Sequence, residues 1–363
     1  MPIALLDRHA RCLVPLLLGV LLSGCASLDY YAQVSRGQLD LLAARQPVDE
    51  LLADPHADAG LKRRLALAQR ARDFASAELG LPDNRSYRLY ADLQRPYVVW
   101  NLFATPELSL QPLTHCFPVA GCVAYRGFYQ LGRARGAAAL LQAEGMDTHV
   151  AGIEAYSTLG WFDDPILNTM LRWNDERLAA VIFHELAHQQ LYVADDTAFN
   201  ESFASFVEQQ GLRQWRAARG LAPDDAGEEP MRRQFTALIL ASRERLQALY
   251  DSPLADDAKR AGKAAEFERL RAEYRALRDG QWAGDRRYDA WMAQPLNNAR
   301  LLPFGLYDQW VESFATLFRQ AGGDWPAFYR RAAALGALPA VQRERHLADL
   351  RDISRNQEPR SMQ

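Results

Sequence analysis

The amino-acid sequence predicts an α+β protein that is mostly helical, with a small sheet lobe followed by a helical lobe. Leucine and alanine recur at helical spacing across residues 28–80, and helical patterns return after residue 211. Between residues 86 and 125, short runs of tyrosine, valine and tryptophan broken by proline are typical of strands. A length of 363 residues allows one large domain with two lobes around a cleft, or two ordinary domains.

The remaining elements follow from local signals. Residues 130–144 have the pattern of a helix, and residues 148–158 have that of a strand. Two aspartates directly before Pro165 form a good helix start. We therefore expect a helical start and the sheet lobe at residues 25–165, and the helical lobe at residues 166–363.

Two long helices are expected within the helical lobe, at residues 231–250 and 254–277. The second carries positive and negative side chains at high density, which is typical of a solvated helical hairpin. An arm that docks a protein partner is the alternative. Residues 295–301 then interrupt the helical pattern, which resumes at Tyr307.

The amino terminus predicts where the protein is located. Arg8 and Arg11 precede an apolar stretch at residues 13–22, and Leu-Ser-Gly then leads to Cys25. This pattern is typical of a secretion signal with a cleavage site of small residues, and it resembles a bacterial lipobox. The resemblance implies a lipoprotein signal peptide at residues 1–24, a lipid anchor on Cys25 and a place on the periplasmic face of the outer membrane. A plain cleaved signal or a short buried helix is the alternative.

Charge and cysteine content narrow the class of partner. Without residues 1–24 the chain has 40 basic and 44 acidic residues, a net charge of −4. Because these charges are interspersed and form no basic stripe, we expect no nucleic-acid partner. Cys116 and Cys122 are close in sequence, and in an oxidising compartment they favour a disulfide over two free thiols.

The most informative motif lies in an apolar helix. His184 and His188 are four residues apart, so they project from one face of a helix and suit two corners of a zinc tetrahedron. Glu185 is rotated by about 100° from His184, where it can act as the general base on a water held by the metal. Buried histidine and glutamate without partners are costly, which favours a metal site over a chance occurrence of the motif.

A catalytic zinc usually takes three protein ligands and leaves one position for water. A second helix is expected at residues 200–208, with Gly211 as a possible interruption, and twelve residues after His188 are enough to lay it antiparallel to the first. Glu201 is then the expected third ligand. Glu208, two turns further on, can accept the other imidazole N–H of a ligand histidine. Glu208 as the ligand, or as a surface glutamate, is the alternative.

The run His-Glu-Leu-Ala-His-Gln followed by Asn-Glu-Ser-Phe-Ala-Ser-Phe-Val-Glu resembles the signature of gluzincin aminopeptidases such as aminopeptidase N. The whole chain is similar to a bacterial family of predicted zinc aminopeptidase lipoproteins. The resemblance implies a gluzincin-like fold, one Zn²⁺, Glu201 as a ligand and Glu208 as the partner of a ligand histidine. Two departures are a shorter connector and the lack of the Gly-Ala-Met-Glu-Asn segment that grips the substrate amine in aminopeptidase N. The hydrolase interpretation therefore rests on more residues than the aminopeptidase interpretation.

In gluzincins an edge strand before the active-site helix receives the peptide substrate, and residues 150–161 are placed to be that strand. An interior strand is equally compatible with the pattern. Glu154 is a candidate for binding the substrate amine, with a surface glutamate as the alternative. Gly160, at the end of the expected strand, is a further candidate for contact with the substrate.

Zinc peptidases commonly need a donor to the oxyanion of the tetrahedral intermediate. The candidates are Tyr307, Asn297 and Asn298, although packing of the tyrosine in the core and capping of a turn by the asparagines are alternatives. We therefore predict a zinc metallopeptidase, more narrowly an aminopeptidase that acts on peptides in the bacterial cell envelope. A zinc endopeptidase is one alternative. The other is a non-catalytic envelope lipoprotein with a structural metal, whose helical hairpin binds a partner.

Overall fold

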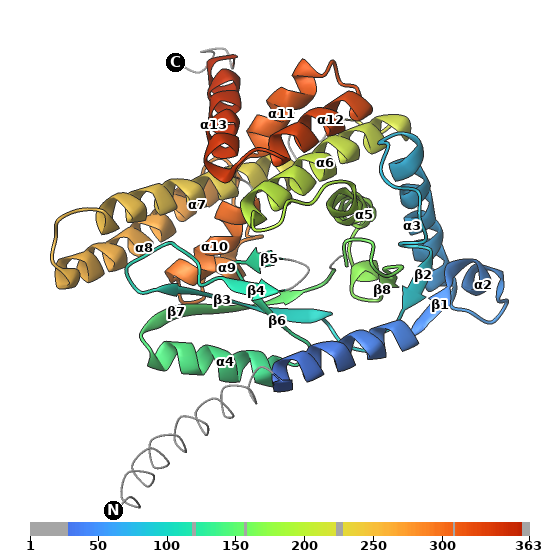
Figure 1. The fold of residues 1–363 in the computed structure, drawn as a ribbon, viewed down its shortest axis with the longest axis horizontal. Helices are drawn as coiled ribbons and strands as arrows, with labels where there is room; N and C mark the ends of the chain where they lie inside the picture. The colour runs from blue at the N-terminus through green and yellow to red at the C-terminus, as the bar shows by residue number, and fades with distance from the viewer. Residues whose placement is uncertain (1–27, 118–120, 156–157, 223–227, 308, 358–363) are drawn as a thin grey trace, which may run out of the picture.

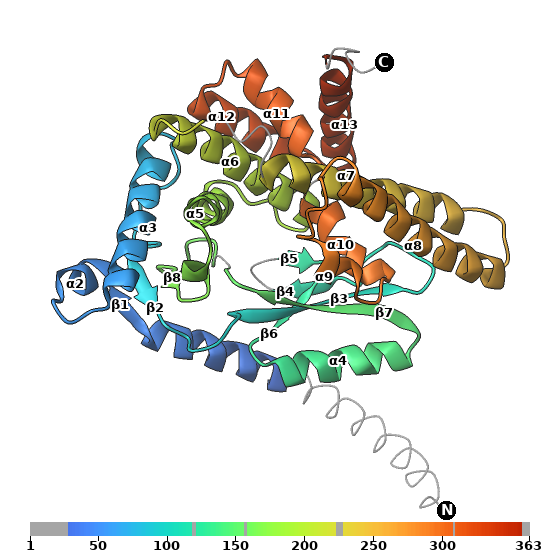
Figure 2. The same ribbon diagram turned by 180° about the vertical axis from the view of Figure 1, so that it is seen from behind.

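The structure is a computed structural model that describes residues 28–117, 121–155, 158–222, 228–307 and 309–357. The predicted signal peptide and the predicted lipidation site Cys25 lie outside the described residues. The described part of the chain is mostly helical and carries small sheets, which confirms the predicted α+β class (Figure 1, Figure 2). None of the described helices combines the length and the apolar character needed to cross a membrane.

One sheet has three antiparallel strands in the order β6 (Arg126–Phe128), β3 (Val99–Pro106) and β7 (Met146–Ile153). Successive side chains of β3 point to opposite faces. Leu102 packs in a cluster with α4 (Leu131–Ala143), and Phe103 packs in a cluster with α10 (Asn298–Tyr307). The strand predicted at residues 148–158 is β7, which begins and ends earlier than expected and lies at an edge of this sheet.

The second sheet joins distant parts of the chain in the order β1 (Arg45–Pro47), β2 (Leu89–Ala91) and β8 (Ile166–Leu167), and a hairpin of β4 (His115–Phe117) and β5 (Gly121–Val123) lies apart from both. The helix start predicted at Pro165 is wrong. Ile166 and Leu167 are buried and pair in parallel with β2, so the chain places two apolar side chains in the core there. After a short 3-10 turn, η1 (Met170–Arg172), the helix begins at Asp175, where the Asn174 side chain accepts a 2.8 Å bond from the Arg177 N–H.

The main hydrophobic core lies among six helices: α3 (Ala59–Ala77), α5 (Asp175–Gln190), α6 (Thr197–Ala218), α11 (Val311–Gln320), α12 (Trp325–Gly336) and α13 (Ala340–Gln357). The interruption predicted at Gly211 is wrong, because α6 continues through it. A Cβ atom at this position would lie 2.7 Å from Leu79 Cδ1 and 3.0 Å from Phe183 Cδ2. Gly211 therefore lets α5 approach α6 closely.

Two long helices, α7 (Glu228–Tyr250) and α8 (Asp256–Asp279), form the predicted hairpin, which extends to one side of the molecule (Figure 1). Its inner face is an apolar cluster that includes Phe235, Leu246 and Leu270. Lys263 ties α8 to the sheet lobe through an ion pair of 2.6 Å with Asp147. Three short or peripheral helices complete the described elements: residues 28–43, α2 (Val48–Ala53) and α9 (Asp289–Met292).

Candidate metal centre

Two helices that pack against each other bring the polar residues of the motif together. In α5, His184, Glu185 and His188 are buried among apolar neighbours. The connector to α6 is fixed by Asn200, whose side chain makes two hydrogen bonds of 2.7 Å with the backbone of Val193. α6 itself starts after Asp196, whose side chain accepts a 2.9 Å bond from the Phe199 N–H. The bonds of Asn200 tie the first turn of α6 to the connector, and Glu201, the next residue, faces the histidines of α5.

The three expected ligand side chains converge on one point. The Nε2 atoms of His184 and His188 lie 3.4 and 3.5 Å from the same atom, Oε2 of Glu201. With metal–ligand bonds of about 2.0–2.1 Å, a tetrahedral zinc separates two ligand atoms by about 3.3–3.4 Å. The buried Oε2 of Glu201 has no hydrogen-bond partner among the described residues. The three side chains therefore fit a divalent cation better than a closed network of hydrogen bonds.

Glu208 contacts the first of these histidines from the other side. Its Oε2 lies 2.9 Å from Nδ1 of His184, which holds the ring so that Nε2 faces Glu201. Nδ1 of His188 is buried and has no such partner among the described residues. Glu201 thus belongs to the group of three side chains that could hold a metal ion, and Glu208 contacts one of the two histidines in that group.

The carboxylates of Glu185 and Glu201 differ in their preference for a proton. Burial raises the pKa of Glu185, and the neighbouring histidines only partly offset this effect. Burial also works to raise the pKa of Glu201, but His188 and His184 outweigh it and hold this pKa at about 2. Glu201 is therefore held as an anion by the two histidines, whereas Glu185 takes up a proton more readily.

Comparison with known families covers most of the chain. The family described as "Putative aminopeptidase" matches residues 29–347. The chain belongs to this family. The matched region contains both helices that carry His184, His188 and Glu201. The family description agrees with the prediction of a peptidase. No curated protein and no solved structure matches the chain.

Glu154, the candidate for binding a substrate amine, lies directly after β7. Its carboxylate accepts a 2.8 Å hydrogen bond from Trp173 Nε1. Guanidinium nitrogens of Arg172 and Arg177 each lie 3.7 Å from it. The charge of Glu154 is therefore compensated within the chain, near the start of α5, which argues against an interaction with the substrate amine.

Asn297 and Asn298, two of the candidate oxyanion donors, are engaged in structural contacts at the start of α10. Asn297 accepts a 2.9 Å bond from the backbone N–H of Arg300 and donates a 2.9 Å bond to the Thr148 carbonyl. Asn298 is fully buried and accepts a 2.9 Å bond from the Tyr250 hydroxyl. Within the described residues, neither amide is hydrogen-bonded to the metal cluster. The geometry of Asn297 agrees with the capping alternative, whereas Asn298 joins α10 to α7 and to the segment after β3.

Gly160, the other substrate-contact candidate, lies beside the carboxyl-terminal end of α5. It has a φ of 79°, and a Cβ atom there would lie 3.4 Å from Oε1 of Gln189. Since Gln189 directly follows His188 in the chain, the loop of Gly160 borders the end of the helix that carries the ligands. The side chain of Tyr307 lies outside the described residues, so its role as a donor stays a prediction.

Three polar side chains near His184, His188 and Glu201 were not predicted from the sequence as site residues. Burial raises the pKa of Tyr125, which lies between β5 and β6, and the charge of Glu201 raises it further. The same two effects raise the pKa of Tyr192 in the connector. Asp164 is buried and contributes to the raised pKa of Glu185. These residues come from three separate segments, and nothing in their local sequence marks them.

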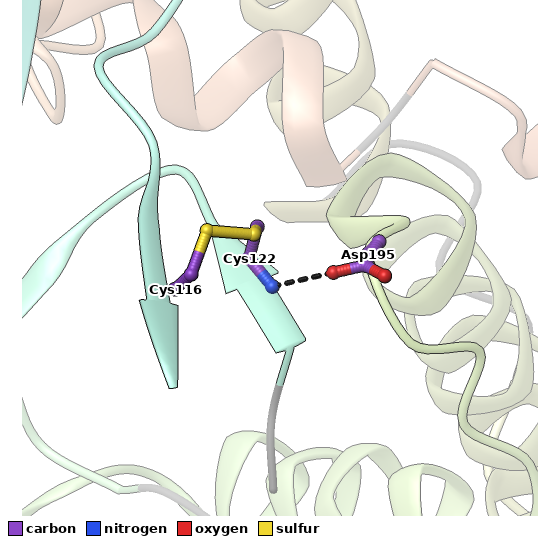
Figure 3. Close-up of a disulfide and its surroundings, with 3 residues drawn as sticks. All are labelled: Cys116, Cys122 and Asp195. Carbon is purple, nitrogen blue, oxygen red and sulfur yellow. Dashed lines mark hydrogen bonds between the residues drawn. A yellow bond between two sulfur atoms is a disulfide. The ribbon is translucent and has the colours of Figure 1, made fainter. Parts of the chain in front are cut away.

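A disulfide hairpin lies against the connector of the two ligand helices (Figure 3). Cys116 in β4 is bonded to Cys122 in β5, and the backbone N–H of Cys122 donates a 2.6 Å bond to Oδ1 of Asp195. Gly121 has a φ of 71°, and a Cβ atom there would lie 2.6 Å from the same oxygen. Glycine thus permits this close approach. The hairpin fixes the connector that carries Tyr192.

Proposed function

We propose that this protein is a zinc-dependent metallopeptidase, and more narrowly an aminopeptidase. The observation that carries the proposal is the meeting of His184, His188 and Glu201 at a carboxylate oxygen that lacks a hydrogen-bond partner among the described residues. Two histidines and one glutamate are a known ligand set of catalytic zinc. Membership of the family described as "Putative aminopeptidase" supports the same class of reaction.

Each residue of the site has a separate role in the proposed hydrolysis of a peptide bond. His184, His188 and Glu201 would hold the ion, and Glu208 would orient His184. When bound, zinc supplies a Lewis acid that polarises the peptide carbonyl and acidifies water. Glu185 takes the proton from the attacking water and passes it to the leaving amine. The raised pKa of Glu185 lowers the cost of carrying this proton between the two steps.

A phenol is the expected donor to the oxyanion. Tyr125 is a candidate among the described side chains, because it follows β5, which is hydrogen-bonded to the connector between α5 and α6. The charges of Glu201 and Glu185 also raise its pKa. Its ring packs 5.6 Å from that of Phe103, between β3 and α10. A phenol is protonated near neutral pH, so its hydroxyl can donate a hydrogen bond. Tyr307 is a second candidate, on the sequence pattern alone.

The outer edge of β7 supports an extended peptide as the substrate. The carbonyls of Thr148 and Glu154 accept hydrogen bonds from side chains on this edge. Between them, Val150 and Gly152 have no partner for their backbone groups on that edge among the described residues. An extended peptide can add there as a further strand through main-chain hydrogen bonds.

The cell envelope is the proposed location. The proposal rests on the lipobox-like pattern that ends at Cys25, which would attach the protein to the membrane by a lipid. The Cys116–Cys122 disulfide is consistent with an oxidising compartment. Labelling with a radioactive fatty acid, in the full-length chain and in Cys25→Ser, tests this location. Equal labelling of both forms would contradict it.

Glu185→Gln is the variant that tests the reaction. Purified in the presence of zinc, it should keep one zinc per chain and lose peptidase turnover by about 10²–10⁴-fold. His188→Ala should lose both zinc and turnover, and Glu176→Gln, a matched change in the first turn of the same helix, should keep both. Hydrolysis at the wild-type rate by zinc-loaded Glu185→Gln would contradict the mechanism.

Two further measurements separate the alternatives. Peptides with free and with acetylated amino termini distinguish the aminopeptidase from an endopeptidase, because only the former requires the free amine. A structural zinc site is normally closed by four protein ligands, whereas the cluster found among the described residues has three. Stoichiometric zinc without any chelator-sensitive hydrolysis would favour the non-catalytic lipoprotein.

A further inference from the structure

A polar cavity lies at the edge of the sheet lobe and includes none of the proposed metal ligands. Its volume is about 420 Å³, and it is bounded by α4, by β7 and by the segment that leads into α10. Its polar lining residues are Arg135, Gln142, Thr148, His149, Asn297 and Arg300. The size suits a small ligand or one charged group of a larger ligand.

Arg300 is a buried cation without an acidic partner. It is 5% exposed, and its guanidinium donates to neutral acceptors: Nη1 to Gln294 Oε1 at 2.6 Å and Nη2 to the Trp291 carbonyl at 3.0 Å. Its Nε atom is buried without a hydrogen-bond partner, and no ion pair forms to it among the described residues. The guanidinium carbon also lies 4.6 Å from the centroid of the Trp291 ring, a cation–π contact. Buried arginines are normally paired with carboxylates, and Arg300 lacks such an anionic partner among the described residues.

The surroundings do not supply the missing negative charge. Among the described residues that line the cavity, none is acidic. Asp147, next to the cavity in the chain, is paired with Lys263 at 2.6 Å. Arg135, which is exposed, adds a second positive charge. Burial, and then Arg300, lower the pKa of His149 to about 4, so this ring is neutral near pH 7 and retains one N–H donor.

We propose that this cavity binds an oxyanion group, a carboxylate or a phosphate, through Arg300. The planar guanidinium matches both groups, and such charge-assisted bonds are strong when they are removed from water. Arg300 also lies in the first turn of α10, where the helix dipole favours an anion. The proposal does not depend on the peptidase function, because Arg300 and Arg135 are not among the proposed metal ligands. The cavity does border the edge of β7 proposed for the peptide, since Thr148 and Val150 line it.

Calorimetric titration of inorganic phosphate into the metal-free protein tests the site. We expect one ion per chain with a dissociation constant on the order of 1 mM or lower. Arg300→Gln should weaken binding at least tenfold. Arg135→Gln, at an exposed position that does not threaten folding, should weaken it about twofold to fivefold.

Arg243→Gln is the matched control. Arg243 is a half-buried arginine whose guanidinium donates to a backbone carbonyl, that of Leu301 at 3.0 Å, but it does not line the cavity. Its replacement should leave phosphate affinity unchanged. Absence of binding by the wild type would overturn the proposal, as would equal binding by the wild type and Arg300→Gln. If Arg300→Gln does not fold, unchanged affinity in Arg135→Gln overturns it.

A tripeptide, as its free acid and as its carboxyl-terminal amide, distinguishes the two sources of the oxyanion. Arg300-dependent binding of the free acid and not of the amide supports the site and assigns it to a peptide carboxylate. Arg300-dependent binding of phosphate with no difference between the two peptides supports the site and assigns it to a phosphate group. Binding of all three probes that does not depend on Arg300 overturns the proposal.

Discussion

Two helix pairs in this protein each bury a glutamate, and the surroundings of the two carboxylates are opposite. Between α7 and α8, Glu266 accepts a 2.8 Å bond from the Ser242 hydroxyl and bonds of 2.7 to 3.0 Å from the Arg245 guanidinium. Between α5 and α6, Oε2 of Glu201 faces two histidine nitrogens and lacks a hydrogen-bond partner among the described residues. A carboxylate satisfied by protein donors stabilises the fold, whereas one left open is available to a cation.

The largest expected effect on zinc content comes from removing the carboxylate of Glu201. Glu201→Ala should lose stoichiometric zinc, and with it any peptidase turnover. A chelator should then lower the melting temperature of the wild type but not that of Glu201→Ala, since an ion at 1,000 times its dissociation constant stabilises a protein by about 4 kcal/mol. Metal analysis and thermal unfolding check this. A variant that still holds one zinc per chain would remove Glu201 from the ligand set.

Removal of the Glu266 carboxylate, which is hydrogen-bonded to protein donors, should affect the stability of the fold and not the zinc content. Glu266→Ala leaves Ser242 and Arg245 without their acceptor, and we expect it to lower the free energy of unfolding by about 2–3 kcal/mol. Its zinc content should equal that of the wild type. Urea unfolding together with metal analysis measures both quantities. Loss of zinc in Glu266→Ala would show that the two helix pairs are not independent.

Glu208→Gln should lower the metal affinity to an intermediate extent and change the free energy of unfolding little. The carboxylate that orients His184 would become a neutral amide, and such changes typically reduce metal affinity by about 10–100-fold. Competition with a zinc-binding dye measures the affinity. If the loss equalled that of Glu201→Ala, Glu208 would have to be counted among the ligands.

The smallest effect is expected at the disulfide hairpin. Asp195→Ala removes the acceptor for the Cys122 N–H and places alanine at a φ of 67°, which together should lower the free energy of unfolding by about 1–2 kcal/mol. Asp195→Asn keeps an acceptor oxygen and tolerates this backbone conformation, so it is the matched control. Equal stability of both variants would mean that the bond contributes nothing.

The group of His184, His188 and Glu201 could be predicted from the sequence, because the spacing of residues along a helix determines which side chains share a face. His184 and His188 share a face on any helix, and the predicted positions of Glu201 and Glu208 needed only a second helix at a suitable distance. The mixed helical and sheet character was likewise visible in local periodicity. Each of these inferences used residues close together in the chain.

The errors arose where distant segments decide the outcome. Pro165 precedes a strand because β2 offers a place to bury Ile166 and Leu167. Gly211 lies inside a helix because α5 comes close to it. The sequence around Tyr125 does not mark it as a site residue, since only the folded chain brings it near Glu201.

The proposed ligands and Glu208 all lie on α5 and α6, which are consecutive in the chain. The entropy lost in bringing two points together grows with the length of chain between them, so this coordination pocket requires only short-range encounters to assemble. The pairing of β3 with β7, the pairing of β2 with β8 and the arginine cavity instead join residues across much longer stretches of chain, which form more slowly. A refolding chain should therefore be competent to capture its ion before the surface meant for a substrate is complete.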